Sequence, residues 1–160
     1  MKILFVYPNS FLTTSIPLGI AYMSAILKES GHTVDIFDTT FYNTGTAQNS
    51  KKESLGQAPE TDYGYFTDVV KSSKRLFDDF IKKVTMFDPD VIAFSIVEES
   101  WCLAKKMIRE IDYGKYHIIV GGVFPTFASE KIEEKFPNIT VCVGEGESWI
   151  IDYIQYYPAF

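Results

Sequence analysis

The fold of this chain is decided by residues 117–147, which read HIIVGGVFPTFASEKIEEKFPNITVCVGEGE. Two short β-branched runs, at 118–120 and 141–143, each lead into glycines, a pattern typical of buried parallel strands. Between them, residues 128–136 place apolar side chains on one helical face and charged side chains elsewhere. Strand, helix and strand in this order form a βαβ unit whose glycines lie at the carboxyl ends of the strands. Ligands bind at that edge of an open parallel sheet.

Composition and charge exclude several classes of protein. The chain has 160 residues, 46% of them hydrophobic, which fits one domain, residues 1–160, with a substantial core. Its net charge of -6 disfavours nucleic acid as a partner, because phosphate binding needs clustered Lys and Arg. An apolar run follows Lys2 as in a signal peptide, but Pro8 interrupts it, and no run approaches the roughly twenty apolar residues of a membrane span. We therefore expect a cytoplasmic protein that binds neither nucleic acid nor membrane.

Cysteines and histidines are too few and too scattered to predict a metal site. Cys102 falls in a predicted helix and Cys142 in a predicted buried strand, so we expect two reduced thiols in or near the core. His32 follows a glycine that ends a helix, and His117 begins a strand, so we interpret both histidines as structural. We predict neither a metal-binding nor a catalytic residue.

Strands and helices alternate along the rest of the chain. Apolar runs predict strands at 3–7 and 91–96, and the second run is the most apolar and is expected at the centre of the sheet. Val34 and Ile36, apolar on either side of Asp35, predict a further strand at 33–37. The spacing of apolar residues predicts helices at 19–30, 66–87, 98–111 and 147–157. Residues 39–65 form a polar excursion that is long for a compact domain. Either it is mobile, which we favour for the isolated chain, or it orders against a partner or ligand.

Five strands alternating with helices predict an α/β fold. We expect a flavodoxin-like three-layer sandwich, with a five-stranded parallel sheet in the order 2-1-3-4-5 and helices on both faces. In this order the loop at 8–10 faces residues 95–98, with Gly121 and Gly122 alongside. Small residues at these places let a broad, flat ligand approach the backbone, since a Cβ would hold it away.

The familiar cofactor motifs of this fold are missing. There is no phosphate loop of the type Gly-x-x-x-x-Gly-Lys-Ser/Thr, and no Gly-x-Gly-x-x-Gly follows the first strand. A phosphorylation receiver needs carboxylates after strands 1 and 3, where this chain has residues 7–9 and 95–97 without any. A flavodoxin needs a Ser/Thr-rich loop after strand 1, and the hydroxyl residues at 10–15 are spread among apolar ones. A flavin carrier therefore stays a weak alternative.

Five segments, in this order, resemble a known family. They are KILFVYP (2–8), PLGIAYMSAILKESGHTVDIFD (17–38), DPDVIAFSI (88–96), IIVGGVFPTFASE (118–130) and VGEGE (143–147). The chain resembles the N-terminal cobalamin-binding domain of cobalamin-dependent radical S-adenosylmethionine enzymes. One branch of that family resembles the magnesium-protoporphyrin IX monomethyl ester cyclase, and the sequence does not select a branch.

The resemblance implies where cobalamin binds. The corrin ring is expected on the carboxyl edge of the sheet, with the nucleotide tail running down between sheet and helices. Ser95 and Val97 match the Ser-x-Leu part of the family pattern, and Gly121-Gly122 match its Gly-Gly part. The Asp-x-His-x-x-Gly of classical cobalamin domains is replaced by residues 7–11, Tyr-Pro-Asn-Ser-Phe, so cobalamin is expected to lack a lower histidine ligand from this loop.

The residues expected to bind the cofactor lie in the loops after the strands. They are Pro8, Asn9, Ser10, Leu18, Gly19, Ser95, Ile96, Val97, Glu98, Gly121, Gly122, Phe124, Pro125, Gly144, Glu145 and Gly146.

The resemblance also implies a missing partner. The Cys-x-x-x-Cys-x-x-Cys motif that binds the 4Fe-4S cluster of the radical domain is absent from these residues. We therefore expect S-adenosylmethionine and the cluster in a C-terminal radical domain outside this chain, and no radical reaction by this chain alone. The full-length protein is expected to transfer a methyl group or to carry out a radical cyclisation or rearrangement on an unknown small molecule. A scaffold domain that keeps the fold without the ligand is the main alternative.

Overall fold

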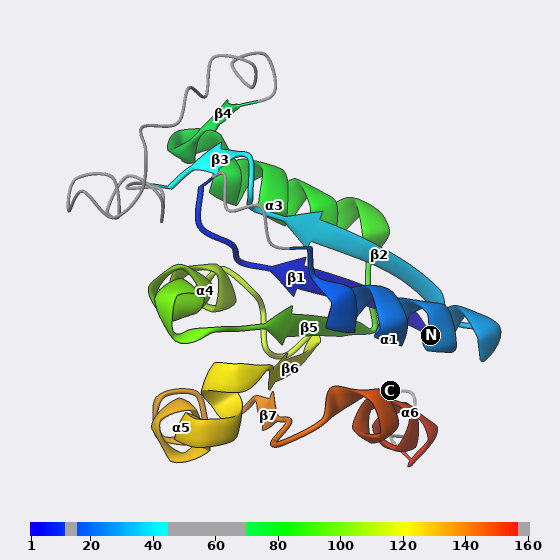
Figure 1. Cartoon of the computed structure of the whole chain (residues 1–160). Helices are drawn as coiled ribbons and strands as arrows, with labels where there is room; N and C mark the ends of the chain where they lie inside the picture. Colours follow the sequence, from blue (N-terminus) through cyan, green and yellow to red (C-terminus); the bar gives the residue numbers. More distant parts are fainter. Residues whose placement is uncertain (12–15, 45–69, 157–160) are drawn as a thin grey trace.

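The computed structural model describes residues 1–11, 16–44 and 70–156. Its central sheet has five parallel strands in the order β2-β1-β5-β6-β7 (Figure 1). Their bounds are β1 Lys2–Tyr7, β2 Thr33–Asp38, β5 Val91–Ser95, β6 His117–Gly121 and β7 Thr140–Val141. Numbered within this sheet alone, the order is 2-1-3-4-5, so the predicted flavodoxin-like architecture is confirmed. The most apolar run, β5, lies at the centre as expected.

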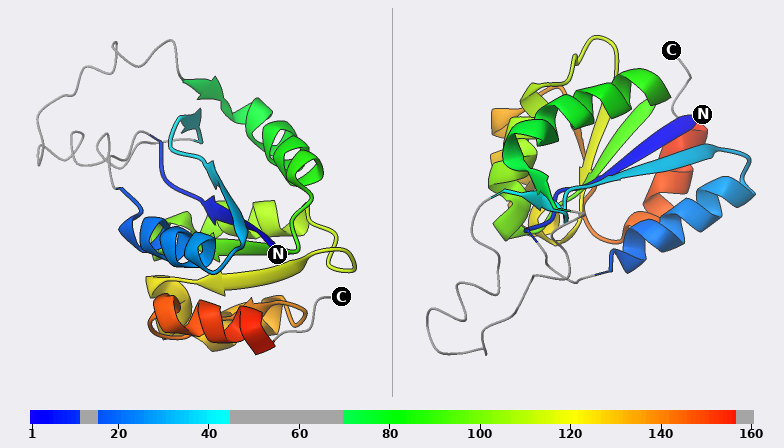
Figure 2. Two further views of the ribbon diagram at one scale, coloured as in Figure 1. Left: turned by 90° about the vertical axis from the view of Figure 1, so that its right-hand side faces the viewer. Right: turned by 90° about the horizontal axis from the view of Figure 1, so that it is seen from above.

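Helices cover both faces of the sheet (Figure 2). Their bounds are α1 Leu18–Glu29, α3 Ser73–Phe87, α4 Trp101–Arg109, α5 Val123–Lys135 and α6 Gly146–Tyr156. Helices α3, α4 and α5 share one buried apolar cluster with one face of the sheet, and α1 and α6 share a second cluster with the other face. None of the described helices is long and apolar enough to cross a membrane.

The alternation of strand side chains explains the two clusters. Ile92 and Phe94 of β5 point into the cluster of α3, α4 and α5, whereas Val91 and Ala93 point toward α1 and α6. Successive residues of a strand face opposite sides of a sheet, and both sides are buried here. The side chains toward α1 and α6 are the smaller ones on this central strand. The sheet face under α1 and α6 is therefore the one with room for a ligand.

Three helices begin or end elsewhere than predicted. The expected helix at 128–136 starts already at Val123, with a kink at Ala128, because Pro125 falls in the first turn, where its missing N–H costs no hydrogen bond. The expected helix at 98–111 divides into a 3-10 turn, η2 (Glu98–Ser100), and α4, which ends at Arg109. The expected helix at 66–87 is described from residue 70, and it begins only at Ser73.

The beginning of the predicted polar excursion belongs to the fold. Thr39 and Tyr42 are buried, and the Thr39 hydroxyl accepts a 2.7 Å hydrogen bond from the Asn9 N–H and donates a 2.8 Å bond to the Asn9 carbonyl. Tyr42 begins a short strand, β3 (Tyr42–Asn43), that pairs with β4 (Lys71–Ser72). Residues 39–44, predicted as the start of the excursion, therefore pack against the rest of the domain through Thr39 and Tyr42. Residues 45–65 lie outside the described residues.

Candidate functional site

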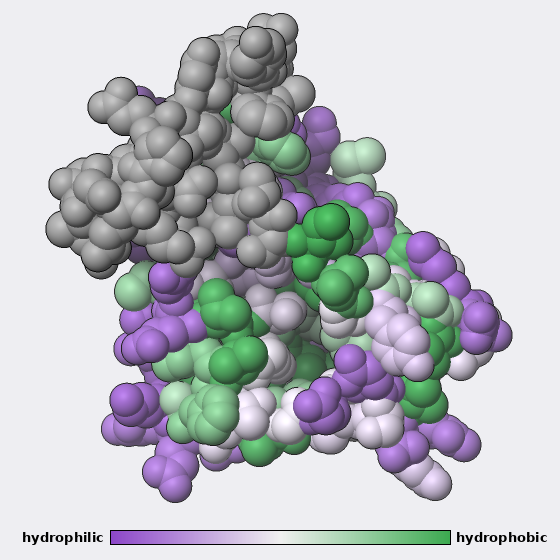
Figure 3. Space-filling model, in the orientation of Figure 1, coloured by the Kyte–Doolittle hydropathy of each residue, from purple (hydrophilic) through white to green (hydrophobic). Residues whose placement is uncertain are grey.

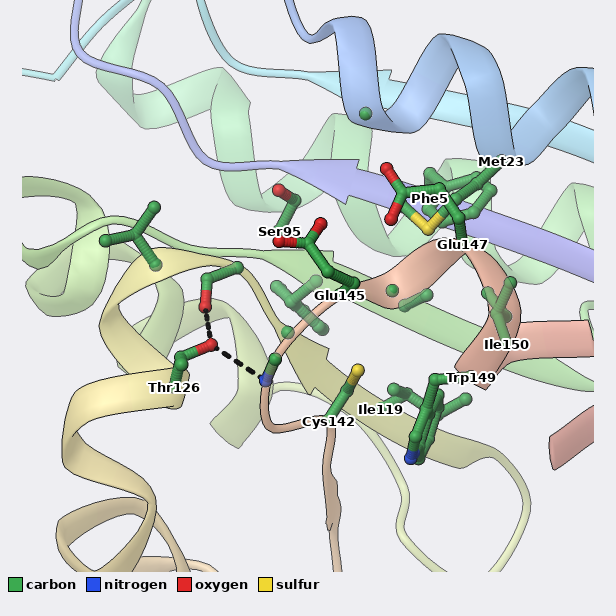
Figure 4. Close-up of a pocket in the computed structure, with 18 of the residues that line it drawn as sticks. Phe5, Met23, Ser95, Ile119, Thr126, Cys142, Glu145, Glu147, Trp149 and Ile150 are labelled. Carbon is green, nitrogen blue, oxygen red and sulfur yellow. Dashed lines mark hydrogen bonds between the residues drawn. The ribbon is translucent and has the colours of Figure 1, made fainter. Parts of the chain in front are cut away.

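A cavity of about 390 Å³ opens at the carboxyl edge of the sheet, between β1, β5, β6 and the helices α1 and α6 (Figure 4). Its floor consists of sheet residues, Phe5, Ala93, Ser95, Ile119 and Gly121 among them. Gly19 and Met23 of α1 form one wall, and Trp149 and Ile150 of α6 form the other. The loops after β6 and β7 complete the lining. We call this cavity the edge pocket.

The strand register places the floor residues side by side. Phe5 of β1 pairs with Ala93 of β5, and Ala93 pairs with Ile119 of β6. One residue pair further toward the carboxyl edge on the same face, Ser95 pairs with Gly121. Phe5 and Ile119 are large, whereas Ser95 and Gly121, which lie closer to the carboxyl edge, are small. The pocket is therefore widest next to Ser95 and Gly121.

The two adjacent glycines after β6 have different roles. A Cβ on Gly121 would lie 3.4 Å from the Cβ of Cys142, which is ordinary contact, so a small side chain fits there. Gly122 has a positive φ of 108°, and a Cβ there would lie 2.7 Å from the carbonyl oxygen of Ile96. Gly122 is therefore required by the backbone, since other residues rarely adopt this conformation and the space is already filled.

Thr126 ties the loops on both sides of the pocket together. Its hydroxyl donates a 2.9 Å hydrogen bond to the carbonyl of Gly122 and accepts a 3.1 Å bond from the N–H of Gly144, as the dashed lines in Figure 4 show. A threonine hydroxyl in a helix commonly bonds the carbonyl four residues earlier. Here the same oxygen also accepts the N–H of Gly144 in the loop after β7. The Thr126 hydroxyl thus links the turn at Gly122 to the turn at Gly144.

Polar groups are concentrated at the opening. Glu145 is exposed, and Glu147 and Ser95 are half-buried, while Phe5, Ile119 and Ile150 lie below them. Burial, together with the nearby Glu147, raises the pKa of the buried Cys142 thiol to about 11, so this thiol is neutral at pH 7. The lining is therefore mostly apolar, with the carboxylates of Glu145 and Glu147 as its acidic groups.

A stack of aromatic rings supports the α6 wall. Trp149 stacks on Tyr153 with a centroid distance of 4.6 Å, and Tyr153 stacks in turn on His117 at 5.4 Å. The Tyr153 hydroxyl is hydrogen-bonded to His117 Nε2 and lies 3.1 Å from the Thr140 hydroxyl. These contacts join α6 to β6 and β7, and they hold Trp149 against the pocket.

The structure brings some of the predicted cofactor-binding residues together in the edge pocket. Those that line it are Gly19, Ser95, Gly121, Gly122, Gly144, Glu145 and Gly146. The others lie outside its lining, and they are Pro8, Asn9, Ser10, Leu18, Ile96, Val97, Glu98, Phe124 and Pro125.

Several of the residues outside the lining have structural surroundings. Asn9 is buried, and its side-chain amide donates a 2.9 Å hydrogen bond to the Thr40 hydroxyl. Ile96 is fully buried in the cluster of α3, α4 and α5, and Phe124 packs on Trp101 on that same side of the sheet. Leu18 and Val97 are exposed. Their part in binding a cofactor stays a prediction.

Exposed apolar side chains gather near the opening. Leu18 of α1, Val97 after β5, Val123 and Phe127 of α5 and Val143 after β7 are all exposed, and Phe127 is the most exposed of them at 86%. Figure 3 shows hydrophobic side chains around a hollow on the face that lies between these elements. Exposed apolar patches are common where a ligand or another domain binds.

Sequence reasoning missed the walls of the pocket. Met23, Trp149 and Ile150 follow the helical spacing of core residues, so no pattern distinguishes them from residues that only pack. Cys142 was predicted to be buried, as it is, but without a place in a site. The accompanying prediction that Cys102 lies in or near the core was wrong, because this thiol is exposed on α4. The described residues contain no group of three or more His, Cys, Asp or Glu that could hold a metal ion.

The fold and the edge pocket together define a flavodoxin-like α/β domain with a cavity at the carboxyl edge of its sheet. Comparison with protein families identifies it further, because the model of the B12 binding domain matches residues 6–152. The chain belongs to the B12-binding domain family. Among curated proteins, no match was found.

Two solved structures have the same fold. One is the cobalamin-dependent S-adenosylmethionine radical enzyme OxsB with aqua-cobalamin and S-adenosylmethionine bound, with 22% identity and a TM-score of 0.61. The other is the radical S-adenosylmethionine methyltransferase TsrM from Kitasatospora setae with tryptophan substrate and a SAM analog bound, with 14% identity and a TM-score of 0.63. The alignments cover 96% of this chain but only 18% and 25% of those proteins. At these identities the likeness shows the fold.

Proposed function

We propose that this chain is the cobalamin-binding module of a radical S-adenosylmethionine enzyme. The observation that carries the proposal is the edge pocket, a largely apolar cavity under α1 and α6 in a chain of the B12-binding domain family. Both structural neighbours are radical S-adenosylmethionine enzymes, and one of these structures contains bound aqua-cobalamin.

The residues present fit the cofactor. In the proposal, the apolar interior between Phe5, Ile119, Met23 and Trp149 takes the nucleotide tail, and the corrin ring lies over the opening near Gly121. Gly121 fits this role because it lines the pocket without a side chain, whereas the positive φ of Gly122 shapes the turn. When bound, cobalamin supplies a cobalt centre that can carry an alkyl group.

This chain offers cobalt no histidine at the carboxyl edge. Of its two histidines, His32 directly precedes β2 and His117 is the first residue of β6, so both lie at the amino ends of strands. The loop after β1, where classical cobalamin domains have their histidine, holds Pro8 and Asn9 instead. We therefore propose that the cofactor binds without a lower histidine ligand from this chain.

The proposal includes a second domain that carries the chemistry. A radical 4Fe-4S cluster is bound by three cysteines, and this chain has two. The chain also spans only about a fifth to a quarter of the length of its structural neighbours. We infer that a C-terminal radical domain holds S-adenosylmethionine and the cluster and docks on the exposed apolar side chains around the opening. Methyl transfer or radical cyclisation or rearrangement in the cytoplasm would be the work of that full-length protein.

Corrinoid binding tests the proposal directly. Purified protein is titrated with hydroxocobalamin, and binding is followed by quenching of tryptophan fluorescence and by retention of the corrinoid on gel filtration. We expect retention, and we expect Gly121→Leu to abolish it by filling the opening. The matched control is Gly114→Leu, which adds the same side chain at an exposed glycine outside the pocket.

The alternatives are outcomes of the same experiment. Failure of the folded chain and of the full-length protein to retain any corrinoid would favour a scaffold domain. A yellow chromophore that copurifies with the chain would favour a flavin carrier.

A further inference from the structure

We propose that the outward face of α1 is a docking surface for the radical domain in the full-length protein, separate from the contacts around the opening of the edge pocket. This inference rests on the proposed function and deepens it, because it names a second surface that the partner covers. The surface consists of Leu18, Ala21, Tyr22 and Ala25, all of which are exposed. We call these four residues the α1 stripe.

The α1 stripe is one continuous side of the helix. Its members stand at positions i, i+3, i+4 and i+7, and side chains at this spacing share one face of an α-helix. Leu18 is 73% exposed and Tyr22 is 59% exposed, so two large apolar side chains stand out from this face. The opposite face carries Ile20 and Leu27, which are buried in the cluster that α1 shares with α6. α1 is therefore apolar on its outer side as well as on its inner side.

The distribution of charge sets α1 apart from other helices of the sheet. α1 has no charged residue before Lys28 in its last turn. The neighbouring helix α6 exposes Ser148, Asp152 and Gln155, and α5 exposes charged side chains at 130, 131, 133 and 134. Polar outer faces of this kind are normal for helices that face water, whereas a helix that is apolar on every side is commonly buried. The outer side of α1 thus has the composition of a face that is covered in the assembled protein.

Two observations favour the radical domain as the partner that covers it. Leu18 belongs both to the α1 stripe and to the exposed apolar side chains around the opening, so the stripe continues the surface on which that domain docks in the proposed function. In addition, α6 packs beside α1 on the same face of the sheet (Figure 2). A domain that follows α6 in the chain is therefore tethered next to the helix that carries the stripe.

The stripe also indicates what kind of surface fits it. Ala21 and Ala25 are small and one turn apart, so the backbone of a partner element can come close to α1 between the larger side chains of Leu18 and Tyr22. Removing these apolar groups from water stabilises the contact, whereas a partner charge placed against them would lose its water without a counter-charge. We therefore expect an uncharged, apolar face of the radical domain against the α1 stripe.

Thiol labelling of the full-length protein and of this chain tests the inference. In a Cys102→Ser background the remaining native thiol, Cys142, is buried, and Tyr22→Cys places one accessible thiol in the stripe. We expect this thiol to react at least about tenfold more slowly in the full-length protein than in the chain alone, because the docked domain excludes the reagent. Glu133→Cys is the matched control, since it replaces an exposed residue of α5 on the other face of the sheet and should react equally fast in both proteins.

A charge within the stripe should weaken the docking. In the full-length protein, Ala25→Glu combined with Tyr22→Cys should restore fast labelling, because the new carboxylate would be buried against an apolar face. Lys131→Glu, which changes a charge on the exposed side of α5, should leave the labelling slow. Urea unfolding of the chain alone shows that each variant is folded.

Corrinoid retention on gel filtration, measured on the same samples, separates the inference from the proposed function. Equal labelling rates of Tyr22→Cys in the two proteins overturn the inference, and retained corrinoid then still supports the proposed function. Slow labelling that survives Ala25→Glu also overturns it, as does slow labelling of the chain alone together with elution as a dimer, because a second copy then covers the stripe. Failure of the full-length protein to retain any corrinoid contradicts the proposed function itself.

Discussion

Gly122 lies so close to the backbone of Ile96 that a Cβ on the glycine would stand 2.7 Å from the Ile96 carbonyl oxygen and 2.9 Å from its nitrogen. Because backbone cannot retreat as a flexible side chain can, we predict that Gly122→Ala lowers the free energy of unfolding by about 1–3 kcal/mol. Gly121→Ala, one residue earlier, should change it by less than about 0.5 kcal/mol. Urea denaturation of both variants measures the difference, and equal losses would contradict this account of the two glycines.

The hydroxyl of Thr126 holds the loop after β7 against the start of α5. We predict that Thr126→Val, which keeps the shape and removes both hydrogen bonds, costs about 1–2 kcal/mol of stability. Amide hydrogen exchange at Gly144 should become faster in this variant, because its N–H loses its acceptor. Thr126→Ser keeps the hydroxyl and should retain the slow exchange. Unchanged amide exchange at Gly144 in Thr126→Val would contradict the hydrogen bond between the Gly144 N–H and the Thr126 hydroxyl.

His117 makes the stability of the fold depend on pH. Burial lowers the pKa of its imidazole below the ordinary 6.5, so the unfolded chain binds a proton that the folded chain excludes. The free energy of unfolding is then highest above the ordinary pKa and falls as the pH drops toward the folded-state pKa.

His32 acts in the same direction, because burial and then the amino terminus lower its pKa. We predict that urea midpoints fall between about pH 7 and about pH 5, and that His117→Gln and His32→Gln each flatten the profile in part. If the urea midpoint falls as steeply with decreasing pH in both single variants as in the unmodified protein, other groups cause the pH dependence.

The two thiols should differ in reactivity. Cys102 is exposed on α4, whereas Cys142 is buried and burial raises its pKa to about 11. Since the thiolate is the reactive form, we predict that a thiol reagent modifies one cysteine of the native protein quickly and the second only on unfolding. Cys102→Ser should remove the fast phase and Cys142→Ser the slow one. A fast phase that survives in Cys102→Ser would mean that the pocket admits the reagent.

The fold could be predicted because its inner strands, β1, β5 and β6, are continuous apolar runs. Leu4 and Phe5 of β1 pair with Ile92 and Ala93 of β5, and both strands are apolar runs buried on both faces, which is typical of parallel strands inside a sheet. Helix ends were less predictable. Pro125 looks like a helix breaker in the sequence, but in the first turn of α5 it is compatible with the helix, so the helix starts before the predicted residue.

The site could be predicted only where glycines mark it. Gly121, Gly144 and Gly146 stand out in the sequence, and all three line the edge pocket. Ala93 and Ile119 enter the site through strand register, and Met23 and Trp149 enter it because two helices far apart in the chain cover the same sheet face. Neither the strand register nor the docking of two distant helices produces a pattern in the local sequence. Gly122 was predicted for the same role as Gly121, and its position against Ile96 is a detail of packing that spacing does not encode.

The walls of the edge pocket come from opposite ends of the described chain, Met23 in α1 and Trp149 in α6. When β1, α1 and the central strands of a nascent chain have left the ribosome, the pocket still lacks the wall that contains Trp149. This wall forms only after α6 has also left the ribosome and docked. In the proposed function, corrinoid binding in the edge pocket therefore requires α6 to be folded and docked. A ligand that binds only this completed state would also pull the folding equilibrium toward it.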